Sequence, residues 1–315
     1  TGQATYSIPL WRPPGTNGVE PQLSRTYTSN NRAAGSISPG WSLAGISQIT
    51  RCHKTIEYDG AITPVYLNLD DVFCLDGQRL ETHSGAYGYP DSSYRTKIEQ
   101  YKLVTAREWM GNGPGWFEVA TRDGLIYEYG RTNNSRAFVP NNNTPYLWSL
   151  SRIRDRQGNN LVVEYTTSSG SLVPATIRYT QAPAVGAAYP YAIVFNYVAR
   201  DADDTLTGYI GGSEFSISQR LVSIDVRYGG TTGTLLRQYR LGYTDSPTTQ
   251  RARLATVQEC AGSSGTDCLA ATTIGYQNGQ IGIAAPVSAV GALPAYHKLR
   301  IADVNDDGRS DLIYS

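Results

Sequence analysis

The most specific chemical pattern in the sequence lies at its end, in the segment Asp303-Val-Asn-Asp-Asp-Gly-Arg-Ser-Asp311. Oxygen-bearing side chains occupy its first, third, fifth and ninth positions, a spacing that wraps a short loop around a hard cation such as Ca²⁺. Gly308 permits the sharp turn that such a loop needs. The predicted ligands are the side chains of Asp303, Asn305, Asp307 and Asp311 and the backbone carbonyl of Arg309.

The residues around this loop indicate which kind of calcium site it would be. An EF-hand would place a bidentate Glu at position twelve, which is Tyr314 here. Residues 299–303 have the pattern of a short strand rather than of a helix. A strand-loop-strand calcium site is therefore favoured, and the alternative is an Asp- and Gly-rich turn that binds no metal.

The elements that must position such a loop are predicted to be strands. The sequence has 32 Gly and 23 Tyr but one Met, and 17% of its residues are charged. This composition indicates many short strands with tight turns and aromatic faces. Segments with strand periodicity, bounded by turn residues, are 124–130, 160–165, 192–197, 221–228, 235–243 and 272–276.

The punctuation between these segments predicts antiparallel hairpins. Turn residues occur at Asp76-Gly77, Asp123-Gly124, Gln157-Gly158 and Gly229-Gly230. The best helical candidate, residues 93–107, has a broken periodicity and is predicted to be strand. We therefore expect an all-β fold built from a large antiparallel, hairpin-rich curved sheet.

The composition changes near the end of the chain, which predicts a domain boundary. Residues 280–294 are rich in Ala, Val, Gly and Pro and resemble a linker. We expect one β-module over residues 1–285, followed by a linker and a truncated calcium-loop repeat over 286–315. Since the sequence begins at Thr1 rather than at a methionine, we expect it to be part of a longer protein.

Charge and hydropathy exclude some classes of partner. The net charge is zero, so nothing favours binding to nucleic acid or to an anionic membrane. No apolar run reaches the length of a membrane span, and no signal-peptide pattern opens the chain.

The four cysteines predict an oxidising compartment. An even count in a β-rich chain poor in Met favours disulfides. The alternatives are plain buried thiols and a metal cluster of Cys52, His53, Cys74 and His83, whose spacing lacks the paired clamps of structural zinc sites. The possible disulfide cysteines fall into two groups, Cys52 with Cys74 and Cys260 with Cys268.

A resemblance to a known family is carried by eight stretches of the sequence, residues 2–10, 13–15, 21–24, 39–45, 49–51, 69–80, 151–165 and 251–260. Together they resemble the amino-terminal module of the Salmonella virulence plasmid B (SpvB) proteins and of the B components of insecticidal toxin complexes. The resemblance covers residues 1 to about 280. The calcium-type loop that follows is similar to the loops of FG-GAP/VCBS repeats, which occur next in related toxins.

The resemblance implies a structural role in a secreted or surface-delivered virulence factor. In the toxin-complex relatives, this module is part of a hollow β-shell that encloses a toxic carboxy-terminal segment, and a propeller of FG-GAP-type repeats docks on the injecting partner. The implied partners are the rest of the same toxin chain, a toxin-complex C component or an injecting A component. The turn at residues 155–161 resembles those of Rhs/YD repeats but is not iterated at a regular period here.

No motif for catalysis is recognisable in the sequence, so we expect no enzyme activity. Nucleophile elbows, zinc-hydrolase helices and phosphate-binding glycine loops are absent. Neighbouring acids such as Asp70/Asp71 and Asp203/Asp204 point to opposite faces of a strand and rarely cooperate.

The alternative function is a glycan- or protein-binding adhesion module that uses exposed aromatic side chains. Residues 110–116 resemble an exposed hairpin tip, and the best candidates for surface aromatics are Trp109 and Trp116. Aromatic residues equally fill the core of a broad sheet.

Overall fold

The structure is a computed structural model, which describes residues 2–31, 35–168, 170–181, 188–262, 264, 266–278, 299–302, 304 and 311–314. The chain divides into two compact units, Thr1–Gln277 and Asn278–Ser315. The predicted boundary between residues 285 and 286 lies outside the described residues.

Eight antiparallel strands of the first unit close into a barrel. Hydrogen-bonded pairing leads from β4 through β5, β6, β7, β8, β9, β10 and β12 back to β4. The ring strands are β4 (Gln48–Cys52), β5 (Val72–Leu75), β6 (Gln78–Ser84), β7 (Ser93–Thr96), β8 (Lys102–Trp109), β9 (Pro114–Thr121), β10 (Ile126–Tyr129) and β12 (Leu147–Arg154).

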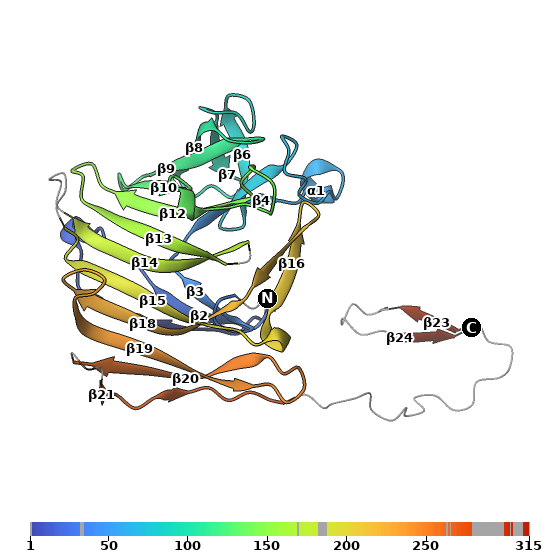
Figure 1. Cartoon of the computed structure of the whole chain (residues 1–315). Helices are drawn as coiled ribbons and strands as arrows, with labels where there is room; N and C mark the ends of the chain where they lie inside the picture. The colour runs from blue at the N-terminus through green and yellow to red at the C-terminus, as the bar shows by residue number, and fades with distance from the viewer. Residues whose placement is uncertain are drawn as a thin grey trace. The chain divides into compact units, whose positions relative to one another are not determined.

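An open antiparallel sheet continues from the barrel, and Figure 1 shows its strands following one another below β12. Its order is β12-β13-β14-β15-β18-β19-β20, and two short strands pair with the far side of β20. These strands are β13 (Asn160–Ser168), β14 (Ser171–Gln181), β15 (Tyr191–Ala199), β18 (Gln219–Tyr228), β19 (Thr234–Asp245), β20 (Ala252–Ala261), β21 (Asp267–Cys268) and β22 (Thr272–Thr273).

The strand β12 belongs to both the barrel and the open sheet. Its first half, Leu147 to Ser149, pairs with β4, and its second half, Arg152 to Arg154, pairs with β13. The strand β10 pairs with β12 over residues 126–129. The Leu150 N–H donates to the Ser47 carbonyl, next to β4, and the Ser149 carbonyl accepts from the Gly130 N–H, next to β10. Because the carbonyl and the N–H of one peptide group point to opposite sides of a strand, β4 and β10 lie on opposite edges of β12.

A three-stranded sheet near the amino terminus packs on one face of the open sheet. It consists of β1 (Thr5–Pro9), β2 (Ser24–Thr28) and β3 (Trp41–Ala44). Alternating apolar residues of both layers share one buried core, which includes Leu10, Trp41, Tyr179, Ile193 and Leu254.

Short elements complete the described part of the chain. They are the one-turn helix α1 (Ile56–Asp59), the 3₁₀ turns η1 (Thr16–Gly18), η2 (Asn133–Ser135) and η3 (Ala202–Asp204), β11 (Arg136–Ala137), and the hairpins β16–β17 (Leu206–Ile210, Ser213–Ile217) and β23–β24 (Leu299–Ala302, Asp311–Tyr314). None of the helices in these ranges is long and apolar enough to cross a bilayer.

The all-β, antiparallel prediction is confirmed, and all four predicted turns join consecutive strands of a hairpin. Asp76 and Gly77, for example, both have positive φ (50° and 80°), as a two-residue turn of this kind requires. Residues 93–107 contain no helix, as expected, but they form two strands, β7 and the first part of β8, joined by a turn at residues 97–101 rather than one strand. The predicted start of a propeller-type repeat falls on the second unit, whose described residues form one hairpin and no propeller.

Candidate functional site

The predicted calcium ligands lie almost entirely outside the described residues. Asp303, Asn305, Asp307 and Arg309 belong to that part of the chain, and Asp311 is the first residue of β24. The segment before the loop is strand β23, as the strand-loop-strand prediction requires. The calcium site itself stays a prediction.

Both suggested disulfides are present in the structure. Cys52–Cys74 joins neighbouring strands β4 and β5 of the barrel, and Cys260–Cys268 joins β20 to the short strand β21. These bonds remove both Cys52 and Cys74 from the alternative metal cluster, in which His53 is exposed. Within the residues that the structure describes, no group of three or more His, Cys, Asp or Glu side chains is placed to hold a metal ion.

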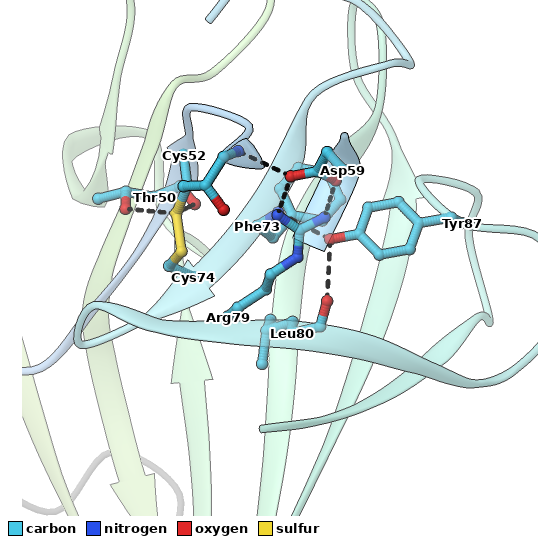
Figure 2. The surroundings of a disulfide bond; sticks show 9 residues. Thr50, Cys52, Asp59, Phe73, Cys74, Arg79, Leu80 and Tyr87 are labelled. Atoms are coloured by element: carbon cyan, nitrogen blue, oxygen red, sulfur yellow. Dashed lines mark hydrogen bonds and ion pairs between the residues drawn. A yellow bond between two sulfur atoms is a disulfide. The ribbon is translucent and has the colours of Figure 1, made fainter. Parts of the chain in front are cut away.

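The surroundings of Cys52–Cys74 form a hydrogen-bonded patch on the barrel wall (Figure 2). Arg79 donates two hydrogen bonds to Asp59, at 2.7 and 2.5 Å, and the Thr55 N–H donates to the same carboxylate at 2.9 Å. These bonds, chiefly those from Arg79, hold the pKa of Asp59 below its usual value. They tie the one-turn helix α1 to β6, so the patch stabilises the fold around the disulfide.

A buried arginine joins three loops at one end of the barrel. The side chain of Arg51 is 1% exposed and its partner Asp71 is 2% exposed, with 3.0 Å between Nη1 and Oδ2. Burial lowers the pKa of Arg51, and the charge of Asp71 opposes this shift. The guanidinium also donates to the carbonyls of Asn68 (2.7 Å), Asn112 (2.8 Å) and Pro145 (2.9 Å).

One carboxylate of each neighbouring acid pair, Asp70/Asp71 and Asp203/Asp204, has a structural role. Asp71 and Asp204 each form a buried ion pair, Asp204 with Arg200 at 2.7 Å. Their sequence neighbours Asp70 and Asp203 are exposed. The two carboxylates of each Asp–Asp pair therefore lie in different environments, although none of the four residues lies in a strand.

At its far side, the open sheet ends among the described residues in the short strands β21 and β22. Among the described residues, β21 and β22 pair with β20 alone, and residues 269–273 are exposed. The Ile274 N–H donates to the Ala255 carbonyl of β20, so by alternation the Thr273 N–H points away from the sheet. Such an edge is a ready template for another strand.

Exposed aromatic residues lie where β8 ends. Trp109 is 48% exposed and Tyr89 is 47% exposed, and their ring centroids are 5.3 Å apart. The tip beyond Trp109 is held by the barrel, since Asn112 bonds to Arg51, to Thr144 and to Leu67. The exposure expected for Trp109 is therefore present, with Tyr89 as a neighbour that the sequence did not indicate.

The prediction that Trp116 is a surface aromatic is wrong, because its side chain is only 8% exposed. The hairpin turn ends sooner than the run of glycines suggests, and β9 begins at Pro114. Trp116 is paired with Arg107 within the strand, and the guanidinium of Arg131 covers its ring at 4.8 Å.

The molecule is thus a large antiparallel β-module, in which a closed ring of strands continues into an open sheet and two disulfides cross-link neighbouring strands. The chain belongs to the SpvB family, because residues 1–209 match the family described as Salmonella virulence plasmid 65kDa B protein. No curated protein sequence matches the chain.

Solved structures with the same fold come from bacterial toxins. The amino-terminal domain of the effector protein SpvB from Salmonella typhimurium strain LT2 is 16% identical (TM-score 0.65), and the match covers 81% of this chain and 98% of that one. A crystal structure of TcdB2-TccC3-Cdc42 is 15% identical (TM-score 0.67) over 85% of this chain. The Photorhabdus luminescens Tc holotoxin pore is 14% identical (TM-score 0.75) over the whole chain. This chain spans 15% and 17% of the length of the two toxin-complex chains.

Proposed function

We propose that the chain is a non-catalytic structural module of a secreted bacterial toxin of the SpvB/Rhs type, which forms part of an encapsulating β-shell around a toxic carboxy-terminal segment. The observation that carries this proposal is the asymmetry of the sheet. One end closes into a barrel, whereas at the other end the short strand β22 pairs, among the described residues, with β20 alone. Following chain that adds strands there would extend the wall.

The similarity to toxin complexes supports this proposal. The similar chains are a TcdB2-TccC3 assembly and a Tc holotoxin pore, and each is several times longer than this chain. By analogy, the proposed partners are the remainder of the same toxin chain, a C component and an injecting A component. The two disulfides fit delivery outside the cell or onto the bacterial surface.

The shell proposal is tested in a longer toxin chain that contains this module. Thr273→Pro removes an N–H that points away from β20, so it should block strand addition while leaving the pairing of β22 intact. We expect protease to degrade the payload of the variant and to spare that of the parent. Equal protection of both payloads would contradict the proposed role of this edge.

The same substitution within residues 1–315 is the control. Since the Thr273 N–H faces no strand formed by the described residues, thermal stability should change by less than about 0.5 kcal/mol. The variant Thr272→Pro, whose N–H faces β20 by the same alternation, should be more destabilising.

We also propose that the loop of residues 303–311 binds Ca²⁺ as the first loop of an FG-GAP/VCBS-type repeat. The pattern of oxygen-bearing side chains supports this proposal. Calorimetric titration should give a calcium affinity that Asp303→Ala and Asp307→Ala each reduce. Unchanged affinity in both variants would rule the site out.

The second candidate function is binding of cell-surface glycans or proteins. The Trp109–Tyr89 pair favours it, because two exposed rings at one hairpin end can stack on a sugar face. On a glycan array, binding that Trp109→Ala abolishes and Trp11→Ala (also exposed, at 47%) preserves would support adhesion. An array without any signal would leave the shell as the better interpretation.

A further inference from the structure

A depression of about 490 Å³ lies on the face of the sheet opposite the amino-terminal layer, and one row of cross-strand neighbours forms its floor. The row runs from Glu128 on β10 to Arg152 on β12, Val162 on β13 and Arg178 on β14. Residues that pair directly across strands lie on the same face of a sheet. The short Val162 between two long arginines therefore creates the depression.

The charges of the depression are matched except at one residue. Glu128 accepts from Arg131 at 3.0 Å and from Arg154 at 3.3 Å. Glu164 pairs with Arg178 at 2.6 Å. The guanidinium of Arg152 makes no hydrogen bond or ion pair with any residue that the structure describes, and its Nε, like that of Arg178, is buried without a partner.

The guanidinium of Arg152 is therefore available to pair with an anion. Burying a polar group without a partner is unfavourable, and arginine binds carboxylates through paired N–H donors. The lining contains three arginines and two glutamates, a surplus of one positive charge. A ligand with one negative charge fits this surplus, whereas the two glutamates disfavour a dianion such as a phosphate monoester.

The rest of the lining indicates what the anion would be attached to. Val162 provides an apolar floor, and the ring of Tyr189 stands beside Arg178, whose guanidinium carbon is 5.3 Å from the ring centroid. The Tyr189 hydroxyl donates to Asn160 Oδ1 at 2.7 Å, which fixes the ring. Asn134 and Thr132 add neutral polar groups at the rim.

We propose that this depression binds a small sugar acid, whose carboxylate pairs with Arg152 and whose ring lies over Val162 beside Tyr189. The volume is within the range of small-molecule sites. This binding is independent of the shell and of the Trp109–Tyr89 pair, so either of those can fail without affecting it.

The test is calorimetric titration of the chain with D-glucuronate, D-glucose and acetate. We expect glucuronate to bind about tenfold or more tightly than either glucose or acetate, because only glucuronate combines the carboxylate with a sugar ring. The variant Arg152→Gln should weaken glucuronate binding about ten- to a hundredfold. Arg152 has no partner to lose, so this variant should keep the parent's melting temperature.

Two further variants make the test specific. Arg156→Gln removes an equal charge from the exposed turn after β12 and should leave glucuronate binding unchanged. Val162→Phe fills the floor and should abolish binding. The proposal is overturned if glucuronate does not bind, if acetate or glucose binds equally well, or if Arg152→Gln binds like the parent.

Discussion

At the scale of single residues, Asp155 determines the hairpin between β12 and β13. Its carboxylate accepts hydrogen bonds from the N–H groups of Gln157 and Asn159, both at 2.9 Å, and from the side-chain amides of Asn159 (2.7 Å) and Asn17 (2.9 Å). Burial alone would raise the pKa of Asp155, but these bonds hold it below its ordinary value of 3.8.

We predict that Asp155→Ala lowers the free energy of unfolding by about 2–3 kcal/mol at neutral pH, because four donors lose a charged acceptor. Since the folded-state pKa is lowered, this contribution is fully present above the unfolded-state pKa and disappears as pH falls through the folded-state value. Urea denaturation at pH 7 and below pH 3 measures the difference between variant and parent.

The matched control is Asp203→Ala, an exposed acid in a short turn, which should change stability by less than about 0.5 kcal/mol. A difference between Asp155→Ala and the parent that stays constant into strong acid would contradict the role of the ionised carboxylate.

At the scale of elements, the hairpins were predictable and the ring closure was not. Gly158 and Asn159 mark the β12–β13 turn locally, so turn chemistry sufficed there. The pairing of β4 with β12 joins segments about a hundred residues apart, and no periodicity encodes which distant edges meet. Arg51 and Asp71, which hold the loops at the barrel end, were missed for the same reason, because their spacing matches no motif.

The buried Arg51–Asp71 pair at the end of the barrel gives a prediction at this scale. Arg51→Met should destabilise the fold by about 3–5 kcal/mol, because Asp71 and three loop carbonyls lose their buried donor. Adding Asp71→Leu should restore part of this loss, since the unpaired buried charge disappears. Thermal or chemical denaturation of the single and the double variant measures the loss of stability and its recovery.

For comparison, Arg95→Met breaks an exposed pair with Glu99, whose side chains are 45% and 42% exposed, and should cost less than about 1 kcal/mol. Equal losses for Arg51→Met and Arg95→Met would show that the Arg51 network contributes no more than a surface pair.

At the scale of the whole molecule, the all-β class and the family were accessible from sequence, whereas the closed barrel required the structure. Glycine-containing turn residues indicate local turns, and the family motifs indicate common ancestry. Trp116 marks the limit of that reasoning: its glycine-rich neighbourhood resembled a tip, but Pro114 and Gly115 take their place in β9.

The two disulfides give a prediction at this scale. Replacing Cys52 and Cys74 by Ser should cost about 3 kcal/mol, and replacing Cys260 and Cys268 slightly less, because the bonds close loops with separations of 22 and 8 residues. In amide hydrogen exchange, loss of Cys260–Cys268 should speed exchange at β20 to β22 and leave the barrel amides protected. Faster exchange throughout β4 to β10 in that variant would be inconsistent with a locally anchored edge.

The double membership of β12 has a consequence for strand alignment. A shift of β12 by two residues would keep its side chains on their faces, and a lone hairpin could tolerate it. Here the same shift would also misalign β4 and β10 on its two sides. The small barrel thus fixes the register of β12, and through β12 the register of the strands that follow in the sheet, β13 to β20.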